Sequence, residues 1–435
     1  MSGGTLDEVL GALAARGCEE AEVYGKSGRS RRVVLGVDGE VAQQTQEEGW
    51  AVRAGGRQGG FFWSATGRPE PQPEWPEVAG APLRLPEAAG PAALAAGDPE
   101  APLLAESEGR ALLEAIAVGL AAELPGARLL RGTLVEGTSD SELRSSRGVD
   151  ARWRSRAATL RVEAMGPGAP RSAAVLDLAE RQARDFRPQA LARRLADLLV
   201  VAAGDPPPER DRGEFVLAPA LGARLLLGLL PLFVGAAAAS RLAPLRDRRG
   251  RVGGDLLTLV DDGCLAGGAL AAPVDGEGVP TRELVLVEEG VLRQPLLAWH
   301  EARPPQTRAA GCSRRASWRD LPRPGPTHFY WRPQRAVAAA ALLGGVARGY
   351  YLLEQRGAGR FDLAAGELAV PVCGFAVRGG RAAAPISGGW LCGTIGAFLR
   401  GVVGVARDLA FLPLDGMIGA PTLLATGLEL RRSPA

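Results

Sequence analysis

The longest apolar passage of the chain covers residues 214–240 and reads EFVLAPALGARLLLGLLPLFVGAAAAS. Its start predicts a short strand that ends at Pro219, because proline cannot donate a hydrogen bond to a sheet. Residues 221–239 then have the length and composition of a buried helix with a kink at Pro231. A membrane-spanning helix is the alternative, but the uncharged run 225–239 is shorter than the roughly 20 residues that a bilayer requires.

The N-terminal half of the chain predicts a mixture of helices and strands. Apolar side chains recur at helical spacing in three segments, residues 5–16, 108–124 and 188–203. Strand-like runs occur at residues 22–24, 31–37, 40–44, 50–53, 60–64, 127–136 and 156–164. Asp38-Gly39 is the strongest short hairpin signal, so a helix followed by a β-meander is expected at the N-terminus.

The C-terminal half predicts short strands and turns, which makes the expected fold class α+β with two domains. Strands are expected at residues 256–260, 283–287 and 291–297. Prolines crowd the segment that follows residue 68, and its few branched apolar residues cannot form a core. The predicted domains are an α+β module at 1–68, a Pro/Ala-rich linker at 69–104, a central α/β segment at 105–205 that completes the N-terminal domain, and a mainly β domain at 212–435.

Composition narrows the functional classes only slightly. The 51 basic residues nearly balance the 49 acidic residues, so no global field favours nucleic acid or an anionic membrane. The five cysteines are widely spaced, and no two of them form a Cys-x-x-Cys motif. This spacing argues against a disulfide framework and against a zinc ribbon. The N-terminus has no basic region followed by an apolar core, so a cytoplasmic protein is expected.

Several motifs resemble those of the TldD/PmbA family, metallopeptidases also described as modulators of DNA gyrase. Phe215-Val-Leu-Ala-Pro219 followed by a leucine-rich helix is similar to the start of the family's C-terminal domain. The N-terminal skeleton AEVYG, DGEV, EEGWAVR resembles the family's N-terminal module. Further landmarks follow in the family's order: DGEGVPTR at 275–282, PTHFY at 326–330, TIG at 394–396 and GAPTLL at 419–424. The resemblance therefore covers nearly the whole chain.

The resemblance also indicates which branch of the family this chain is similar to. In the catalytic branch the helix carries His-Glu, three residues, then His, and a cysteine near the C-terminus completes the zinc site. Here the matching positions are Leu227, Gly228, Leu229, Leu230, Pro231 and Leu232, and residues 407–417 contain no cysteine. Leucine has no lone pair for a metal and glycine has no carboxylate to activate water. The chain thus resembles the metal-free PmbA/TldE branch, with no catalytic residue and no metal ligand expected.

That branch implies a non-catalytic subunit of a TldD/TldE-type zinc metallopeptidase complex, which degrades or processes unfolded or small peptides. A TldD-like partner would supply the zinc, the glutamate base and the attacking water, so no cofactor is expected in this chain. Self-association in the absence of that partner is a further option. The main alternative is a stand-alone peptide-binding or gyrase-associated adaptor, and a third is an enzyme with a metal site built only from carboxylates.

The two histidines offer little for catalysis by this chain. His300 is followed by two prolines rather than by a second histidine, so it does not begin a zinc motif. His328 replaces an asparagine common in the family, and it fits either a cleft wall or a satisfied core position. The row His328, Phe329, Tyr330 and Trp331 could line a peptide groove, although strand side chains alternate faces and part of the row should be core.

Two clusters of charged residues remain. Asp261, Asp262, Asp275 and Glu277 could hold a hard cation, but their Asp-Gly and Gly-rich contexts are typical of turns whose carboxylates cap backbone groups. Five arginines between residues 241 and 251 suit a solvated loop, with docking to an acidic surface as the alternative. No aromatic residue interleaves with them, which argues against nucleic acid as a partner.

Overall fold

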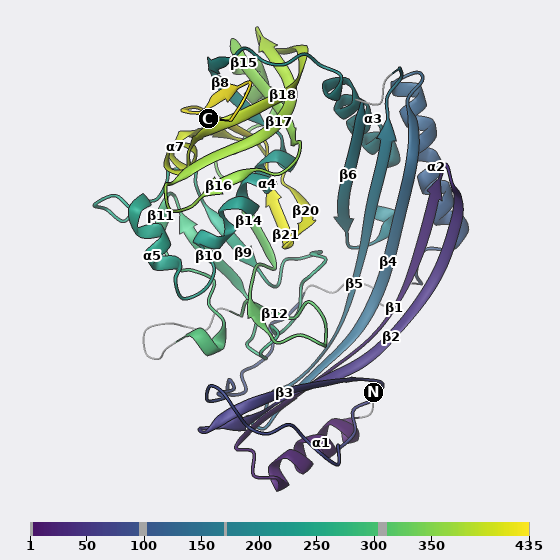
Figure 1. The fold of residues 1–435 in the computed structure, drawn as a ribbon, viewed down its shortest axis with the longest axis vertical. Helices are drawn as coiled ribbons and strands as arrows, with labels where there is room; N and C mark the ends of the chain where they lie inside the picture. Colours follow the sequence, from purple (N-terminus) through teal and green to yellow (C-terminus); the bar gives the residue numbers. More distant parts are fainter. Residues whose placement is uncertain (1–2, 95–101, 169–171, 303–310, 435) are drawn as a thin grey trace.

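The computed structural model describes residues 3–94, 102–168, 172–302 and 311–434. They form two lobes that follow one another along the chain (Figure 1). The N-terminal lobe contains α1 (Gly3–Ala15), β1 (Glu20–Gly36), β2 (Gly39–Gly56), β3 (Gly59–Thr66), α2 (Glu106–Glu123), β4 (Arg128–Ser145), β5 (Asp150–Met165), β6 (Ala173–Glu180) and α3 (Pro188–Ala202). Its strands make one antiparallel sheet in the order β3-β2-β1-β4-β5-β6.

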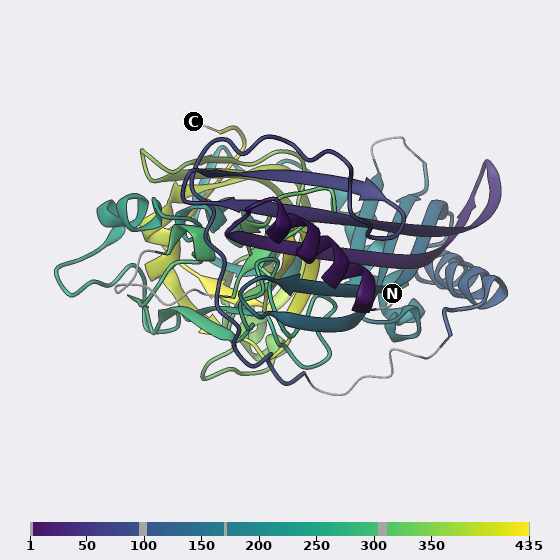
Figure 2. The same cartoon turned by 90° about the horizontal axis from the view of Figure 1, so that it is seen from below.

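Helices α2 and α3 cover one part of this sheet and close the core of the N-terminal lobe. Leu113, Ile116 and Leu120 recur at helical spacing along α2 and are fully buried. They pack with Leu160 of β5 and Leu195 of α3 in one apolar cluster. Helix α1 packs over the other end of the strands, as Figure 2 shows from below.

The strands of the N-terminal lobe are much longer than the alternating runs in the sequence predict. Residues 22–24 and 31–36 belong to one strand, β1, and residues 40–44 and 50–53 belong to one strand, β2. The residues between these runs are polar or glycine, and only the glycines Gly25 and Gly49 among them are buried, so they carry no period-2 hydrophobic signal. The hairpin predicted at Asp38-Gly39 is present, with Gly36 paired to Gly39.

The C-terminal lobe is built from two large sheets. Its elements are β7 (Arg210–Arg212), β8 (Glu214–Leu217), α4 (Pro219–Leu229), α5 (Ala238–Leu242), β9 (Leu259–Asp262), β10 (Glu283–Glu288), β11 (Val291–Leu292), β12 (Ser313–Arg314), β13 (Arg323–Pro324), β14 (His328–Trp331), α6 (Ala339–Gly345), β15 (Arg348–Gln355), β16 (Arg360–Asp362), β17 (Glu367–Arg378), β18 (Arg381–Thr394), α7 (Ile395–Gly401), β19 (Val402–Val405), β20 (Ala410–Leu414), β21 (Gly416–Ala420), β22 (Leu423–Ala425) and β23 (Glu429–Arg431). One sheet has nine strands, with the order β19-β22-β8-β15-β17-β18-β23-β7 and β16 beside β17. The other has six strands, in the order β11-β10-β9-β14-β21-β20.

Helix α4 contacts strands of both sheets, and the apolar passage of residues 214–240 therefore lies in the centre of this lobe. The sequence predicts a single kinked helix over residues 221–239, and this prediction is wrong. The helix ends at Leu229, a 3-10 turn covers Leu230–Leu232, and Val234 pairs with Leu296 before α5 begins. Pro231 lacks the N–H that would continue the α-helical ladder, so it breaks the helix instead of bending it. The prediction of only short strands is also wrong for β17 and β18.

The long strands β1, β2, β4 and β5 curve past the C-terminal lobe (Figure 1). The chain between β3 and α2 bridges the lobes: Ala79 pairs with Gly60 of β3, and the Ala92 N–H donates to the Pro273 carbonyl at 2.9 Å. The described part of this proline-rich segment is therefore held along its length by backbone hydrogen bonds. None of the helices among the described residues combines the length and the hydropathy needed to cross a membrane.

Candidate functional site

Helix α4 and the turn after it carry only apolar residues at the positions that match the zinc motif, which are Leu227, Gly228 and Leu232. Leu232 is fully buried, and Leu227 and Gly228 are partly buried. The ring of Phe361 from β16 packs directly on Gly228: a Cβ built on this glycine would lie 2.2 Å from the Phe361 Cζ. A side chain longer than hydrogen at residue 228 cannot coexist with Phe361 in its present position. These residues do not fit a zinc ion, because no donor atom of a side chain is present and an aromatic ring occupies the space.

Residues that could ligate a metal elsewhere do not converge. Within residues 3–94, 102–168, 172–302 and 311–434, no three His, Cys, Asp or Glu side chains are grouped so that they could hold an ion. The aspartates of the first acidic turn cap backbone groups instead: Asp261 Oδ1 accepts the Thr327 N–H at 2.7 Å and Asp262 Oδ1 accepts the Cys264 N–H at 2.9 Å. Asp275 accepts three N–H groups. Burial raises the pKa of Asp261 to about 7, although the Thr327 N–H opposes this shift.

His328 is a satisfied core histidine. Its Nδ1 is 2.8 Å from the Asp262 carbonyl oxygen, and its Nε2 accepts the Leu270 N–H at 3.3 Å. These two contacts define a neutral imidazole with the proton on Nδ1. Burial lowers the pKa of His328, which favours the same form.

The row His328–Trp331 forms β14 and does not make a peptide groove as a unit. Phe329 and Trp331 are fully buried in the core of the C-terminal lobe, so they cannot line a groove. Strand β14 pairs with β9 on one side and with β21 on the other, which leaves no free edge for a peptide. Tyr330 is also buried and packs against Phe411.

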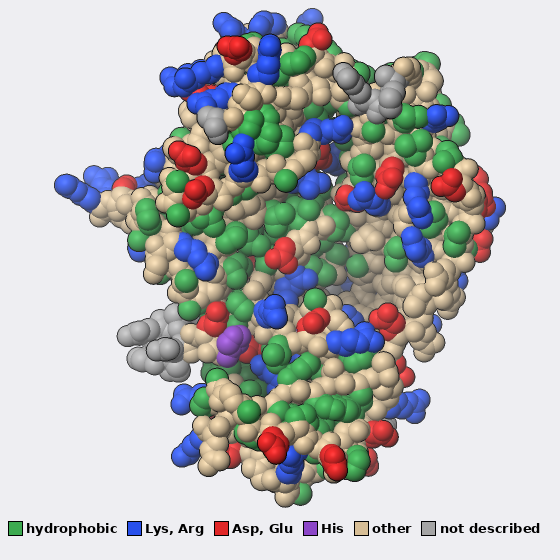
Figure 3. All heavy atoms as spheres, viewed as in Figure 1, with side chains coloured by type: hydrophobic (Ala, Val, Ile, Leu, Met, Phe, Trp, Pro, Cys, Tyr) green, Lys and Arg blue, Asp and Glu red, His purple; other side chains and the backbone are tan. Residues whose placement is uncertain are grey.

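A cleft of about 430 Å³ lies between the two lobes, and His328 is the member of that row that lines it. The surface in Figure 3 is hollowed between the lobes. The N-terminal lobe contributes β6, the loop after it and α3, and the C-terminal lobe contributes β20 and β21. Strand β6 is the last strand of its sheet and β20 is the last strand of another, so two sheet edges meet at this cleft. Its walls include Leu178, Phe186, Arg187, Arg194, Phe411 and Met417.

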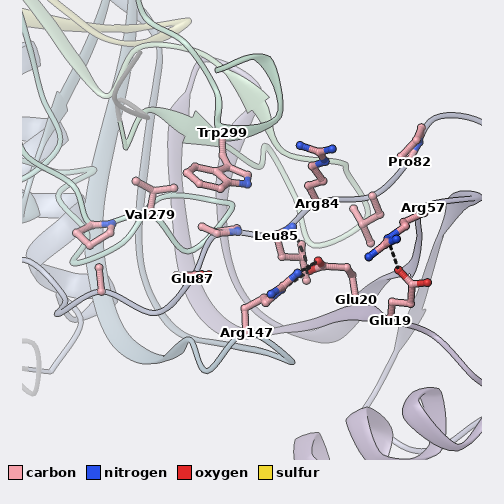
Figure 4. Close-up of a pocket in the computed structure, with 14 residues that line it drawn as sticks. Glu19, Glu20, Arg57, Pro82, Arg84, Leu85, Glu87, Arg147, Val279 and Trp299 are labelled. Carbon is pink, nitrogen blue, oxygen red and sulfur yellow. Dashed lines mark hydrogen bonds and ion pairs between the residues drawn. The ribbon is translucent and has the colours of Figure 1, made fainter. Parts of the chain in front are cut away.

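A second cavity, of about 870 Å³, lies between the proline-rich segment and both lobes (Figure 4). Glu20 anchors this segment: its Oε2 accepts the Leu85 N–H at 3.3 Å, and its carboxylate binds the Arg147 guanidinium. Trp299 lines the cavity from the C-terminal lobe. Residues 82–87 and Ala89 are therefore a wall of this cavity.

A network of charged side chains, buried except for His300, joins the lobes, and the sequence did not predict it. Glu22 of β1 accepts two hydrogen bonds of 2.7 Å from Arg53 of β2, and it also accepts one from Arg315 of the C-terminal lobe. Arg53 reaches Glu277 at 3.4 Å, and His300 Nδ1 is 3.0 Å from the same carboxylate. We refer to Glu22, Arg53, Glu277, His300 and Arg315 as the interlobe network.

The network controls the protonation of its members. Burial would raise the pKa of Glu277, but hydrogen bonds from His300 and Ser313 and the charge of Arg53 lower it to about 2. Burial opposes the charged form of Arg53, but the charge and hydrogen bonds of Glu22 raise its pKa above the ordinary value. The hydrogen bond to Glu277 raises the pKa of His300.

The raised pKa of His300 predicts a stability that depends on pH. A group whose pKa is higher in the folded than in the unfolded state stabilises the folded state fully at pH values below its unfolded-state pKa, which is about 6.5 for histidine. This contribution to stability is lost as the pH rises through the folded-state pKa. The melting temperature of the protein should therefore exceed that of His300→Gln mainly in acidic buffer. Melting curves of both proteins from pH 5 to 9 would measure this, and a difference that does not change with pH would contradict it.

The arginine-rich loop forms hydrogen bonds mainly within itself and with residues close to it in the sequence. Arg241 donates to the Pro231 and Val234 carbonyls, and Asp247 Oδ1 accepts the N–H groups of Arg249 and Arg251. These contacts fit a solvated loop with local hydrogen bonds. No feature of the loop indicates a partner.

The comparisons with known proteins agree with this architecture. Residues 211–432, about half of the chain, match the model of the PmbA/TldA metallopeptidase C-terminal domain. A metalloprotease TldD homolog from Buchnera aphidicola is 28% identical over 170 residues, which are 39% of this chain and only 35% of that relative. TldE from Thermococcus kodakarensis superimposes with a TM-score of 0.85 at 16% identity, over 98% of this chain and 99% of that one.

A candidate DNA gyrase modulator from Thermotoga maritima has the same fold, with a TM-score of 0.79 at 17% identity over 98% of this chain and 99% of that one. At such identities the structural matches establish the fold, and the match to the domain model establishes the family. The two-domain α+β architecture expected from the sequence is confirmed. The chain belongs to the TldD/PmbA family.

Proposed function

We propose that this chain is the non-catalytic subunit of a cytoplasmic TldD/TldE-type zinc metallopeptidase that acts on unfolded or small peptides. The catalytic zinc, the glutamate base and the attacking water would belong to a TldD-like partner. This chain would contribute part of the wall of an enclosed chamber. No chemical step is assigned to its own residues.

The packing of Phe361 on Gly228 is the observation that carries this proposal. A metallopeptidase of this family needs donor side chains on this helix, and here the helix offers a glycine beneath an aromatic ring and leucines in the core. Packing as well as side-chain chemistry therefore argues against a zinc site on this helix, because the Phe361 ring occupies the space beside Gly228.

The cleft between the lobes supports a role in holding peptides. Its walls combine apolar side chains with arginines, a combination that suits the side chains and carboxylates of a peptide. The edges of β6 and β20 at this cleft could pair with an extended substrate through backbone hydrogen bonds, which read no particular sequence.

The proposal predicts that activity depends on a partner. The purified chain should contain no stoichiometric zinc by elemental analysis and should not cleave an unfolded test protein such as casein. After co-expression with a TldD-like chain from the same organism, the two should copurify and cleave it, and a chelator should abolish the cleavage.

Three outcomes would reject the proposal. Stoichiometric metal in the isolated chain would point to an enzyme with its own site. A TldD-like chain that is fully active and does not bind this protein would remove the need for an accessory subunit. Peptide binding by the isolated chain, without any copurifying TldD-like chain, would favour the adaptor.

A further inference from the structure

The outer edge of β2 is an unusually long unprotected sheet edge. Over residues 39–47 β2 pairs with β1 only, because β3 pairs with β2 from Gly49 onward and the Glu48 carbonyl already accepts the Gly67 N–H at 3.0 Å. Residues 39–47 are exposed on both faces of the sheet, whereas residues 49–56 of the same strand are buried. One side of this segment therefore presents backbone N–H and C=O groups that pair with no strand among the described residues.

Proteins usually protect such an edge from pairing with other chains. The common devices are proline, charged side chains (lysine above all), a β-bulge or a covering loop. Residues 39–48 read GEVAQQTQEE: they contain neither proline nor lysine, their register with β1 has no bulge, and their only charges are glutamates near the two ends of the segment. At the hairpin end Val37 and Val41 are 68% and 56% exposed. Such an edge is a template for an added strand.

We infer that residues 40–47 of β2 bind an extended strand of the TldD-like partner subunit, joining the sheets of the two subunits. This inference rests on the proposed function, and it adds the surface through which the partner is bound. The pairing would be made by backbone hydrogen bonds along the outer rim of the molecule, where β2 lies in Figure 1.

The charges at the edge favour a different chain over a second copy of this one. In an antiparallel pairing that matches the whole segment to itself, Glu40 of one copy would face Glu47 of the other, and facing like charges are destabilising. Glu40 is already paired with Arg110 at 3.0 Å. Glu47 forms no ion pair with any of the described residues, so a partner strand with a basic residue opposite Glu47 would be complementary.

The position of the edge favours a subunit over a peptide substrate. Neither of the two cavities described above is lined by residues 39–48. Recognition of a substrate strand needs pockets for its alternate side chains, and an edge exposed on both faces offers none.

Hydrogen–deuterium exchange of this chain, alone and in its complex with the TldD-like chain, tests the inference directly. Alternate amides of residues 40–47 should exchange at least about tenfold more slowly in the complex, because each gains a hydrogen bond. A complex whose formation leaves these rates unchanged would overturn the inference and leave the proposed function intact. Failure to form any complex would overturn both. Protection of the isolated chain that grows with its concentration would assign the edge to a second copy and also overturn it.

Two proline variants provide an independent test. Successive N–H groups of a strand point to opposite edges, so one of Gln43→Pro and Gln44→Pro removes a donor to β1 and the other removes a donor at the free edge. The variant that keeps the stability of the isolated chain should bind the TldD-like chain up to about tenfold more weakly, since it lacks one backbone hydrogen bond to the partner strand.

Wild-type affinity of that variant would overturn the inference. Glu47→Lys should also weaken binding, and Glu209→Lys, an exposed glutamate on the other lobe, is the matched control.

Discussion

Replacement of Glu22 with glutamine is expected to destabilise the folded protein by about 3–5 kcal/mol, the cost of removing one partner from a buried ion pair. Glu22 is the only carboxylate of the interlobe network that binds both Arg53 and Arg315, whose side chains are 7% and 2% exposed. Glutamine keeps the shape of the side chain but leaves two buried guanidinium groups without this counter-charge. The free energy of unfolding from urea denaturation measures the effect.

A neighbouring glutamate provides the control. Glu19 pairs with Arg57 at 3.8 Å, and their side chains are 60% and 92% exposed. Water screens such a pair, so Glu19→Gln should change the stability by less than about 1 kcal/mol. Equal effects of Glu22→Gln and Glu19→Gln would show that the network does not hold the lobes.

Gly228→Ala is expected to destabilise the protein by about 1–3 kcal/mol, the usual cost of overpacking a close contact. The new methyl group would lie 2.2 Å from the Phe361 ring, so the ring or the helix must move. A loss of stability would be informative, because replacing a glycine inside a helix with alanine otherwise stabilises the helix by about 0.8–1.0 kcal/mol. Thermal and urea unfolding would both measure it.

Two further variants separate packing from helix propensity. Gly11 lies in α1 with no atom within 4 Å of a Cβ built on it, so Gly11→Ala should stabilise the protein slightly. In a Phe361→Ala background, Gly228→Ala should lose its penalty, because the ring that it meets is gone. A penalty of the same size in both backgrounds would contradict the role assigned to Phe361.

The sequence predicted those features that local patterns encode. The apolar stripe of α2, the hairpin at Asp38-Gly39 and the lack of donor side chains at Leu227, Gly228 and Leu232 are all readable from neighbouring residues. The matched landmarks also pointed to the family.

The sequence could not predict features that depend on distant partners. Glu22 and Arg315 are 293 positions apart, and a glutamate between Ala21 and Val23 in an apolar run is only a weak hint that it is buried. Phe361 carries no local signal that it covers Gly228. The length of β2 was missed for a different reason, since its exposed half has no alternation to detect.

The pairing of β7 with β23 brings the first and last strands of the C-terminal lobe together. Leu430 lies opposite Asp211, and the Arg432 N–H donates to the Glu209 carbonyl at 3.2 Å. A unit whose entry and exit are adjacent can be joined to other sequence at either end without any change to its internal pairing. The sheet of the C-terminal lobe therefore closes on itself at its entry and exit, while the interlobe network ties the same lobe to the N-terminal one.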